Sequence, residues 1–409
     1  MKPSKKELAL VIGSLATTFL LVEILLRVFM SPSTISSGSL FGKELPPMRV
    51  VPSDWQAYGT TVSKHQEPYR DLKMDGKPIT HGDLFGVMRE DLDVAYVPLE
   101  NFESANGWWK SNNLGARRDS FTKYSPGPGH VRTLMFGDSY TQGSRIPQEQ
   151  SFSAVLEKLT PNTEYLNFGV DGYSTGQAYL RYKQVQGIIS FDKVIMTLVP
   201  TADLWRNISV SRYFGDRWAS YKLQPRYYLE DGLLKLARSP FKDLATQLLD
   251  GPNFPVSRKH LLFHDAFYFR EYEPSAITDF LVSIRIVKAA IASFKRKKLH
   301  REIRDPSGEA VTVTQAIIAA MQRDVIARGA TFKLVILPTY ADILSYKSVE
   351  SFRHEWRVML DALCKDVECI KLMANMNKYK PNEFDFGYDG THYGASTNRI
   401  IAETLKSYQ

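Results

Sequence analysis

Ser139 is the residue of this sequence whose surroundings most suggest chemistry, because it lies in the segment GDSYTQG directly after an apolar run. A serine hydroxyl is a poor nucleophile until a base removes its proton, and a carboxylate usually orients that base. Of the eight histidines, His392 alone has an aspartate three positions before it, Asp389 in the segment YDGTHYGAS. One turn of chain can join that carboxylate to one imidazole nitrogen and leave the other for the serine proton. Ser139, Asp389 and His392 are therefore the candidate catalytic residues.

A second serine, Ser174, competes for the role of nucleophile because the segment GYSTG fits the G-x-S-x-G pattern of a nucleophile elbow. An elbow lies directly at the end of a strand, whereas three residues separate this pattern from the apolar run before it. Serine is also a preferred helix N-cap, and helical spacing begins near Thr175. We expect Ser174 to cap a helix.

The elements that must position these residues alternate along the chain. Five apolar runs are candidate strands: 132–136, 163–168, 193–199, 332–338 and 368–373. Helical spacing occupies five further segments: 151–159, 175–190, 311–329, 351–366 and 395–408. Alternation of apolar strands with helices predicts an α/β fold, with a mainly parallel five-stranded sheet covered on both faces. The loops at the carboxyl ends of such strands meet at one edge, so the loop of Ser139 can face that of His392.

Three segments together, FGDSYTQG, NFGVDGY and DGTH, resemble the SGNH hydrolase superfamily, also called GDSL esterases and lipases. The resemblance covers roughly residues 131–207 and 311–407. It implies a flavodoxin-like three-layer α/β/α domain that cleaves acyl esters, often acetyl groups on carbohydrates.

The resemblance also implies roles for single residues. Ser139 matches the nucleophile of the family, and Asp389 and His392 match its acid and base. Gly172 matches the glycine of the oxyanion hole, with the backbone amide of Ser139 as a further donor.

One position departs from the family pattern. The third block of the family carries an Asn before an Asp, and that Asn donates to the oxyanion. Here the segment TLVPTADLWRN places Ala202 at this position, followed by Asp203. Thr201 and Asn207 are near enough in sequence to supply the missing donor. Together with Asp138, these two residues and Asp203 are candidate substrate-binding residues.

The N-terminus predicts a membrane anchor. Three lysines in residues 1–6 precede the apolar stretch 8–30, which is long enough to span a bilayer with a cytoplasmic N-terminus. Glu23 and Arg27, four positions apart, could pair near the membrane interface. A cleaved signal peptide is the alternative. Either outcome exports the rest of the chain, to the periplasm in a Gram-negative cell, so we expect no nucleic-acid partner despite the net charge of +8.

The exported chain is expected to have two parts, an irregular N-terminal region at 31–130 and a hydrolase-like domain at 131–409. The first is rich in Pro, Gly and aromatic residues. Its adjacent Trp108 and Trp109 either pack in the interior or form a platform for sugar stacking.

An insertion at about 208–310 interrupts the alternation of strands and helices. It contains a predicted hairpin at 225–237 with Asp231-Gly232 at its turn, and a predicted amphipathic helix at 277–304. The basic run KRKK within that helix is either a solvated helix end or a contact for anionic lipid or polysaccharide.

Metal and cofactor chemistry has little support. His260 and His264 are spaced for one helix face, but no third ligand is evident, and we predict no metal and no cofactor. Cys364 and Cys369 either form a disulfide, which export to an oxidising compartment permits, or remain free as buried cysteines.

The sequence therefore predicts a membrane-anchored extracytoplasmic serine esterase. We expect its substrates to be acyl esters, above all acetyl esters, on carbohydrate or envelope glycan. Two alternatives stay open. One is an O-acyltransferase that uses the same three residues, and the other is a non-catalytic binding module marked by Ala202.

Overall fold

The computed structural model describes residues 4–50, 73–74, 77–78, 88–104, 106–212, 214, 223–242, 246–247, 250, 254–276, 278–387 and 389–408. The chain divides into two compact units, Met1–Thr60 with Leu248–His300, and Thr61–Gln247 with Arg301–Gln409. Part of the predicted insertion thus belongs with the N-terminal segment. Other parts of the insertion and of the 31–130 region lie outside the described residues.

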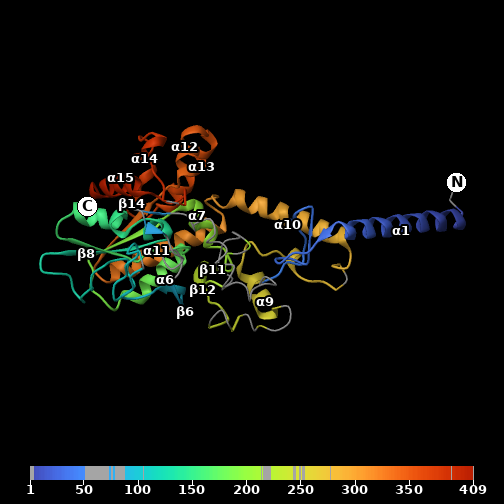
Figure 1. Cartoon of the computed structure of the whole chain (residues 1–409), viewed down its shortest axis with the longest axis horizontal. Helices are drawn as coiled ribbons and strands as arrows, with labels where there is room; N and C mark the ends of the chain where they lie inside the picture. Colours follow the sequence, from blue (N-terminus) through green and yellow to red (C-terminus); the bar gives the residue numbers. More distant parts are fainter. Residues whose placement is uncertain are drawn as a thin grey trace. The chain divides into compact units, whose positions relative to one another are not determined.

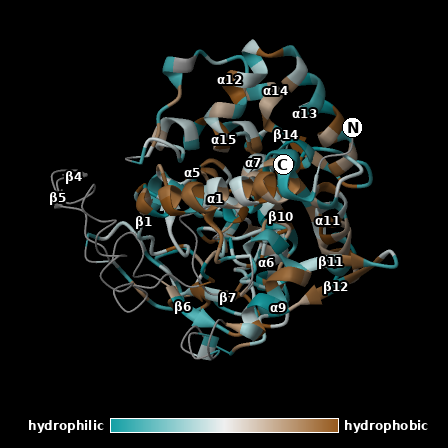
Figure 2. Cartoon of the chain, turned by 90° about the vertical axis from the view of Figure 1, so that its right-hand side faces the viewer, coloured by the Kyte–Doolittle hydropathy of each residue, from teal (hydrophilic) through white to brown (hydrophobic). Residues whose placement is uncertain are grey.

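The first unit begins with the long helix α1 (Lys5–Val28), which carries many hydrophobic residues (Figures 1 and 2). Among the described helices, α1 alone is long and apolar enough to cross a membrane, and a signal sequence would have the same character. Ser4 caps it and forms a capping box with Glu7. The remaining elements of this unit are β1 (Met30–Ser31), β2 (Ser39–Leu40), β3 (Lys43–Glu44), α9 (Pro255–His264), η4 (Arg270–Tyr272) and α10 (Val282–Glu302).

Glu23 and Arg27 of α1 contact a later segment of the same unit instead of each other. The Glu23 carboxylate accepts hydrogen bonds from the first two amides of α10, at 2.7 and 3.0 Å. Arg27 donates to the carbonyl oxygen of Phe280. The predicted pairing between Glu23 and Arg27 is therefore wrong, because the unsatisfied amides at the start of α10 are the better partner for the carboxylate.

The second unit is built on a five-stranded sheet in which every neighbouring pair of strands is parallel. Its strands are β8 (Val131–Phe136), β9 (Thr163–Asn167), β10 (Lys193–Leu198), β13 (Thr331–Ile336) and β14 (Cys369–Lys371). Their spatial order, β9-β8-β10-β13-β14, is the flavodoxin-like order 2-1-3-4-5. The predicted fold class is confirmed.

Helices cover this sheet in two groups (Figure 1). Leu134, Met135 and Phe136 follow one another in β8 and are all fully buried, so both faces of the sheet are covered. One group is α5 (Phe152–Leu159) packed on α15 (Ala395–Lys406), and the other is α6 (Thr175–Val185), α11 (Glu309–Ala327) and α13 (Glu350–Leu363). Shorter elements of the unit are α4 (Ser139–Gln142), η3 (Gln148–Gln150), α7 (Pro200–Arg206), α12 (Tyr340–Ser348), α14 (Leu372–Met376) and η5 (Pro381–Glu383).

The predicted hairpin is confirmed as β11 (Arg226–Glu230) paired antiparallel with β12 (Leu233–Ala237). Asp231 and Gly232 at its turn both have positive φ, 51° and 75°. This is the backbone conformation that an Asp-Gly hairpin turn requires.

Part of the 31–130 region packs on the sheet domain. Its hairpin strands are β6 (Met88–Asp91) and β7 (Ala95–Pro98), and β4 (Lys73–Met74) pairs with β5 (Lys77–Pro78) nearer the N-terminus. Val94 and Val97 form a buried cluster with Val170, Tyr173 and Leu180. Trp108 and Trp109 are buried, which makes them packing residues and excludes an exposed sugar platform.

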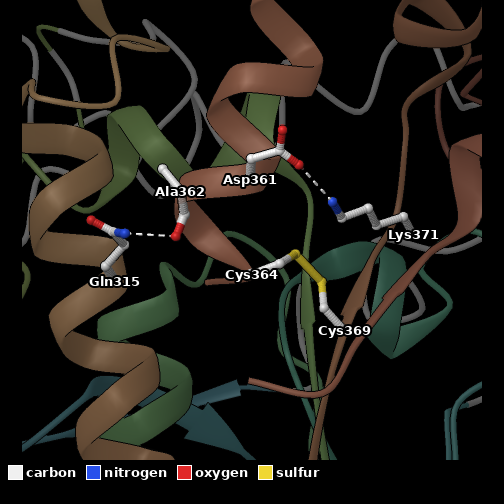
Figure 3. Close-up of a disulfide and its surroundings, with 6 residues drawn as sticks. All are labelled: Gln315, Asp361, Ala362, Cys364, Cys369 and Lys371. Atoms are coloured by element: carbon white, nitrogen blue, oxygen red, sulfur yellow. Dashed lines mark hydrogen bonds and ion pairs between the residues drawn. A yellow bond between two sulfur atoms is a disulfide. The ribbon is translucent and has the colours of Figure 1, made fainter. Parts of the chain in front are cut away.

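Cys364 and Cys369 form a disulfide between the end of α13 and the start of β14 (Figure 3). Nearby, Lys371 pairs with Asp361 at 3.1 Å, and Gln315 of α11 donates to the carbonyl oxygen of Ala362 at 2.6 Å. Of the two expectations for these cysteines, the bonded one holds. The disulfide and the two polar contacts together fix the end of α13 to its neighbours.

Candidate active site

Ser139 is the first residue of the short helix α4, three positions beyond the end of β8. Asp138 caps this helix by accepting a hydrogen bond from the amide of Tyr140 at 2.9 Å. A Cβ atom on Gly137 would lie 2.0 Å from Oγ1 of Thr197, so only glycine fits at this close approach. The turn places Ser139 at the carboxyl edge of the sheet.

Asp389 and His392 lie on the loop between η5 and α15. One carboxylate oxygen of Asp389, Oδ1, accepts hydrogen bonds from the amides of Thr391 and His392, at 2.9 and 3.0 Å. The other, Oδ2, lies 2.5 Å from Nδ1 of His392. Tyr140 supports the loop, because its ring lies 4.9 Å from the imidazole and its hydroxyl donates to the carbonyl oxygen of Thr391 at 3.3 Å.

The imidazole of His392 also reaches the serine, since its Nε2 lies 2.8 Å from Oγ of Ser139. A proton on Nδ1 facing Asp389 leaves Nε2 free to accept the serine proton. Burial opposes ionisation of Asp389, but the hydrogen bond and charge of His392, together with the loop amides, lower its pKa. An ionised Asp389 holds the imidazole in this tautomer. The three candidate catalytic residues are thus within hydrogen-bonding distance in the order that acyl transfer requires.

Gly172 and Ser139 present two backbone amides that could hold an oxyanion. Neither amide hydrogen-bonds to another described residue, and the Ser139 amide opens a helix, where no intrahelical acceptor exists. Gly172 has φ 74°, and a Cβ atom there would lie 2.8 Å from the hydroxyl oxygen of Tyr96. That hydroxyl donates to the carbonyl oxygen of Asp171 at 2.9 Å, and burial raises the pKa of Tyr96 to about 12.

The structure does not bring Thr201 and Asn207 into the site as replacements for the missing Asn at Ala202. Thr201 donates through its hydroxyl to Asp342 at 2.6 Å. The Asn207 side chain is buried, and its amide nitrogen donates to Oγ1 of Thr314 at 2.7 Å. Both side chains therefore bind neighbouring helices of the domain.

Asp138 and Asp203 are buried carboxylates that share Arg206 as their partner. Nη1 of Arg206 lies 3.1 Å from Oδ2 of Asp138 and 3.5 Å from Oδ1 of Asp203. Burial raises the pKa of both carboxyl groups, most strongly that of Asp203, and the positive charge of Arg206 opposes the rise. These two predicted substrate-binding residues are engaged inside the protein. The sequence signal for Arg206 is its place one helical turn after Ala202.

Arg145 links the loops of the site. Its guanidinium lies 3.4 Å from the carboxylate of Asp171, beside Gly172, and 3.5 Å from the carboxylate of Asp389. No motif in the sequence marks Arg145 or Tyr96, because both act through contacts between segments far apart in the chain.

Ser174 caps α6, as predicted. Its hydroxyl accepts from the amide of Gln177 at 3.2 Å, and the Gln177 side chain accepts from the amide of Ser174 at 3.2 Å, which completes a capping box. Within the described part of the chain, no three His, Cys, Asp or Glu side chains are grouped to hold a metal ion.

The fold and the site together define an α/β domain of flavodoxin-like topology with a Ser-His-Asp arrangement at the carboxyl edge of its sheet. No protein-family model matches the chain, and no curated protein matches it.

Several solved structures are similar to the chain. An alpha/beta hydrolase enzyme from the metagenome of Lake Arreo matches at 11% identity, 69% of this chain, 95% of its own and TM-score 0.36. An acetyl xylan esterase is 14% identical, and the match covers 68% of this chain and 99% of the esterase with a TM-score of 0.33. A member of the lipolytic protein G-D-S-L family from Veillonella parvula is 10% identical, and the match covers 68% of this chain and 96% of that protein with a TM-score of 0.28.

Proposed function

We propose that this protein is a serine esterase that cleaves acyl esters on carbohydrate, with Ser139 as nucleophile. The observation that carries the proposal is the continuous chain of hydrogen bonds from Asp389 through His392 to Ser139, at 2.5 and 2.8 Å. Carbohydrate and acetyl esters enter as the substrate class through the resemblance of the motifs to SGNH hydrolases.

The geometry supports a two-step reaction. Nε2 of His392 takes the proton of Ser139 while Oγ attacks the ester carbonyl carbon, and the amides of Ser139 and Gly172 donate to the resulting oxyanion. The carbon–oxygen bond to the alcohol then breaks, and His392 returns its proton to the departing alkoxide. Water then attacks the carbonyl carbon of the acyl-serine and gives one proton to His392. The bond to Oγ breaks, His392 returns this proton to Ser139, and a carboxylic acid is released. If a sugar hydroxyl takes the place of this water, the same steps transfer the acyl group.

A fluorophosphonate tests this mechanism on the full chain in detergent. We expect one adduct on Ser139, hydrolysis of p-nitrophenyl acetate, and loss of both in Ser139→Ala. Ser174→Ala is the matched control and should keep both. An adduct on Ser174 would reassign the nucleophile, and a folded protein with no adduct and no turnover would favour the non-catalytic binding module. A sugar-dependent yield of acylated sugar would identify the transferase.

We further propose that α1 anchors the domain to a membrane, with the domain on the extracytoplasmic side. The apolar length of α1 and the lysines before it support this orientation. The disulfide offers a test, since disulfides persist in oxidising compartments. Cys364 and Cys369 in protein taken directly from cells should resist alkylation until a reductant is added. Alkylation without reductant would contradict export.

A further inference from the structure

Arg206 ends the helix α7, one turn after the position where the missing oxyanion donor would be expected. The family pattern places an Asn at the position of Ala202, near the start of this helix. Arg206 follows four positions later, so the two residues lie on the same helix face. Alanine supplies no polar group at position 202, and the longer side chain of Arg206 can reach back toward that position.

The guanidinium of Arg206 lies between the two segments that supply the oxyanion amides. Its Nη1 is 3.1 Å from the carboxylate of Asp138, which directly precedes Ser139. The same nitrogen is 3.3 Å from the carbonyl oxygen of Tyr173, which directly follows Gly172. One cation therefore contacts the neighbours of both candidate donor amides.

The described part of the chain uses only one nitrogen of this guanidinium, Nη1. Arginine carries five N–H groups, and the hydrogen bonds of Arg206 to described residues all use Nη1. Neither Nε nor Nη2 hydrogen-bonds to any residue that the structure describes, and the side chain is 16% exposed. Burial alone would lower the pKa of Arg206, but the charges of Asp138 and Asp203 outweigh it and raise that pKa. The group stays a cation, and its Nε and Nη2 donors are not used by the described residues.

We propose that Arg206 is the third oxyanion donor and replaces the Asn that is absent at Ala202. This role rests on the proposed esterase function. In it, Nη1 of Arg206 stays bound to Asp138 while Nη2 or Nε donates a hydrogen bond to the carbonyl oxygen of the ester. The donation strengthens as negative charge develops on that oxygen. A charge-assisted hydrogen bond from a guanidinium is stronger than one from an amide, so a single arginine can replace the Asn.

Substitution of Arg206 tests the assignment by its effect on turnover. In Arg206→Ala we expect kcat for p-nitrophenyl acetate to fall about 100- to 1000-fold with little change in KM, the usual effect of losing one oxyanion donor. Guanidinium ion added to Arg206→Ala should restore part of kcat, and it should restore none in Ser139→Ala. Arg399→Ala, at an exposed position on α15, is the matched control and should keep wild-type kcat.

A second substitution separates catalysis from folding. Ala202→Asn in the Arg206→Ala background restores the family pattern and should recover at least about tenfold of the loss, within the range one donor contributes. Wild-type kcat in a folded Arg206→Ala protein would overturn the proposal, as would failure of both Ala202→Asn and guanidinium to raise its kcat.

Loss of the buried partner of Asp138 could unfold Arg206→Ala, so Arg206→Lys and Arg206→Gln accompany it. Arg206→Lys keeps the positive charge and should retain a higher kcat than Arg206→Gln. A wild-type kcat in both variants would overturn the proposal. If the wild type itself neither hydrolyses the ester nor labels at Ser139, the esterase function fails. If it labels normally and Arg206→Ala labels at the same rate, only the role of Arg206 fails.

Discussion

The Oγ of Ser139 lies 2.8 Å from Nε2 of His392, although 253 positions separate the two residues in the sequence. Ser139 follows the interior strand β8, which lies between β9 and β10, and His392 precedes the last helix, α15. No local motif joins them. They meet because parallel strands bring the loops at their carboxyl ends to one edge of the sheet. The geometry of this pair therefore depends on the whole sheet domain being folded.

Asp389→Asn should abolish most of the activity. The amide of Asn has only one acceptor oxygen and no charge, so it neither fixes the Nδ1–H tautomer of His392 nor stabilises the imidazolium formed during attack. We expect kcat to fall by up to about 10⁴-fold, as for the equivalent change in a serine protease triad. The rate of fluorophosphonate labelling at Ser139 measures the effect.

Asp305→Asn is the matched control for this change, because Asp305 is exposed and its carboxylate contacts Ser307 of its own turn. It should label at the wild-type rate. An Asp389→Asn protein that labels as fast as Asp305→Asn would show that His392 does not depend on the carboxylate.

Gly172→Ala should distort the oxyanion hole. A Cβ atom at this position would lie 2.8 Å from the Tyr96 hydroxyl oxygen, and the left-handed φ of 74° costs an L-residue about 1–2 kcal/mol. Turnover should therefore fall while Ser139 and His392 are unchanged. Removing the hydroxyl with Tyr96→Phe in the same chain should recover part of the loss, because it removes the close contact.

The control for the glycine is Gly187→Ala, where a Cβ atom would have no neighbour within 4 Å. Activity and melting temperature should both stay near the wild-type values. If Gly172→Ala turns over like Gly187→Ala, then Gly172 is not close to the reacting ester.

Ser174→Ala should lower stability without affecting the nucleophile. Loss of a serine N-cap typically costs about 0.5–2 kcal/mol of unfolding free energy, and α6 would lose its capping box with Gln177. Urea unfolding measures the cost, and Ser174→Asp, which can also cap, should show less of it. Loss of fluorophosphonate labelling in a folded Ser174→Ala protein would contradict the assignment of Ser139.

Much of the fold could be predicted because its signals are local. Apolar runs with helical segments between them gave the five strands, and the Asp-Gly pair gave the hairpin of β11 and β12. The pairing of Asp389 with His392 is local too, since three positions separate them.

The contacts that could not be predicted from the sequence join segments that are far apart in the chain. Glu23 was expected to pair with Arg27, yet it binds amides that lie 259 and 260 positions away. Tyr96 reaches the Gly172 loop from another strand pair, and no periodicity encodes that approach. Arg206 was visible in the sequence one turn after Ala202, but its direction toward Asp138 appears only in the folded chain.

Acidification should destabilise the first unit through His260. This side chain lies on α9 with its ring 4.8 Å from that of His264, and its Nε2 is buried without a hydrogen-bond partner among the described residues. Burial, assisted by the charge of His264, lowers the pKa of His260 to about 4, whereas an unfolded histidine titrates near 6.5. Between pH 4 and pH 6.5 the unfolded chain binds a proton at His260 that the folded unit does not bind. The contribution of His260 to the free energy of unfolding is therefore complete above about pH 6.5 and is lost as the pH drops toward 4.

Thermal unfolding of the wild type and of His260→Gln, at pH 7 and at pH 4.5, measures this contribution. The wild type should lose more melting temperature on acidification than the variant does, and equal losses in the two proteins would exclude His260 as the source.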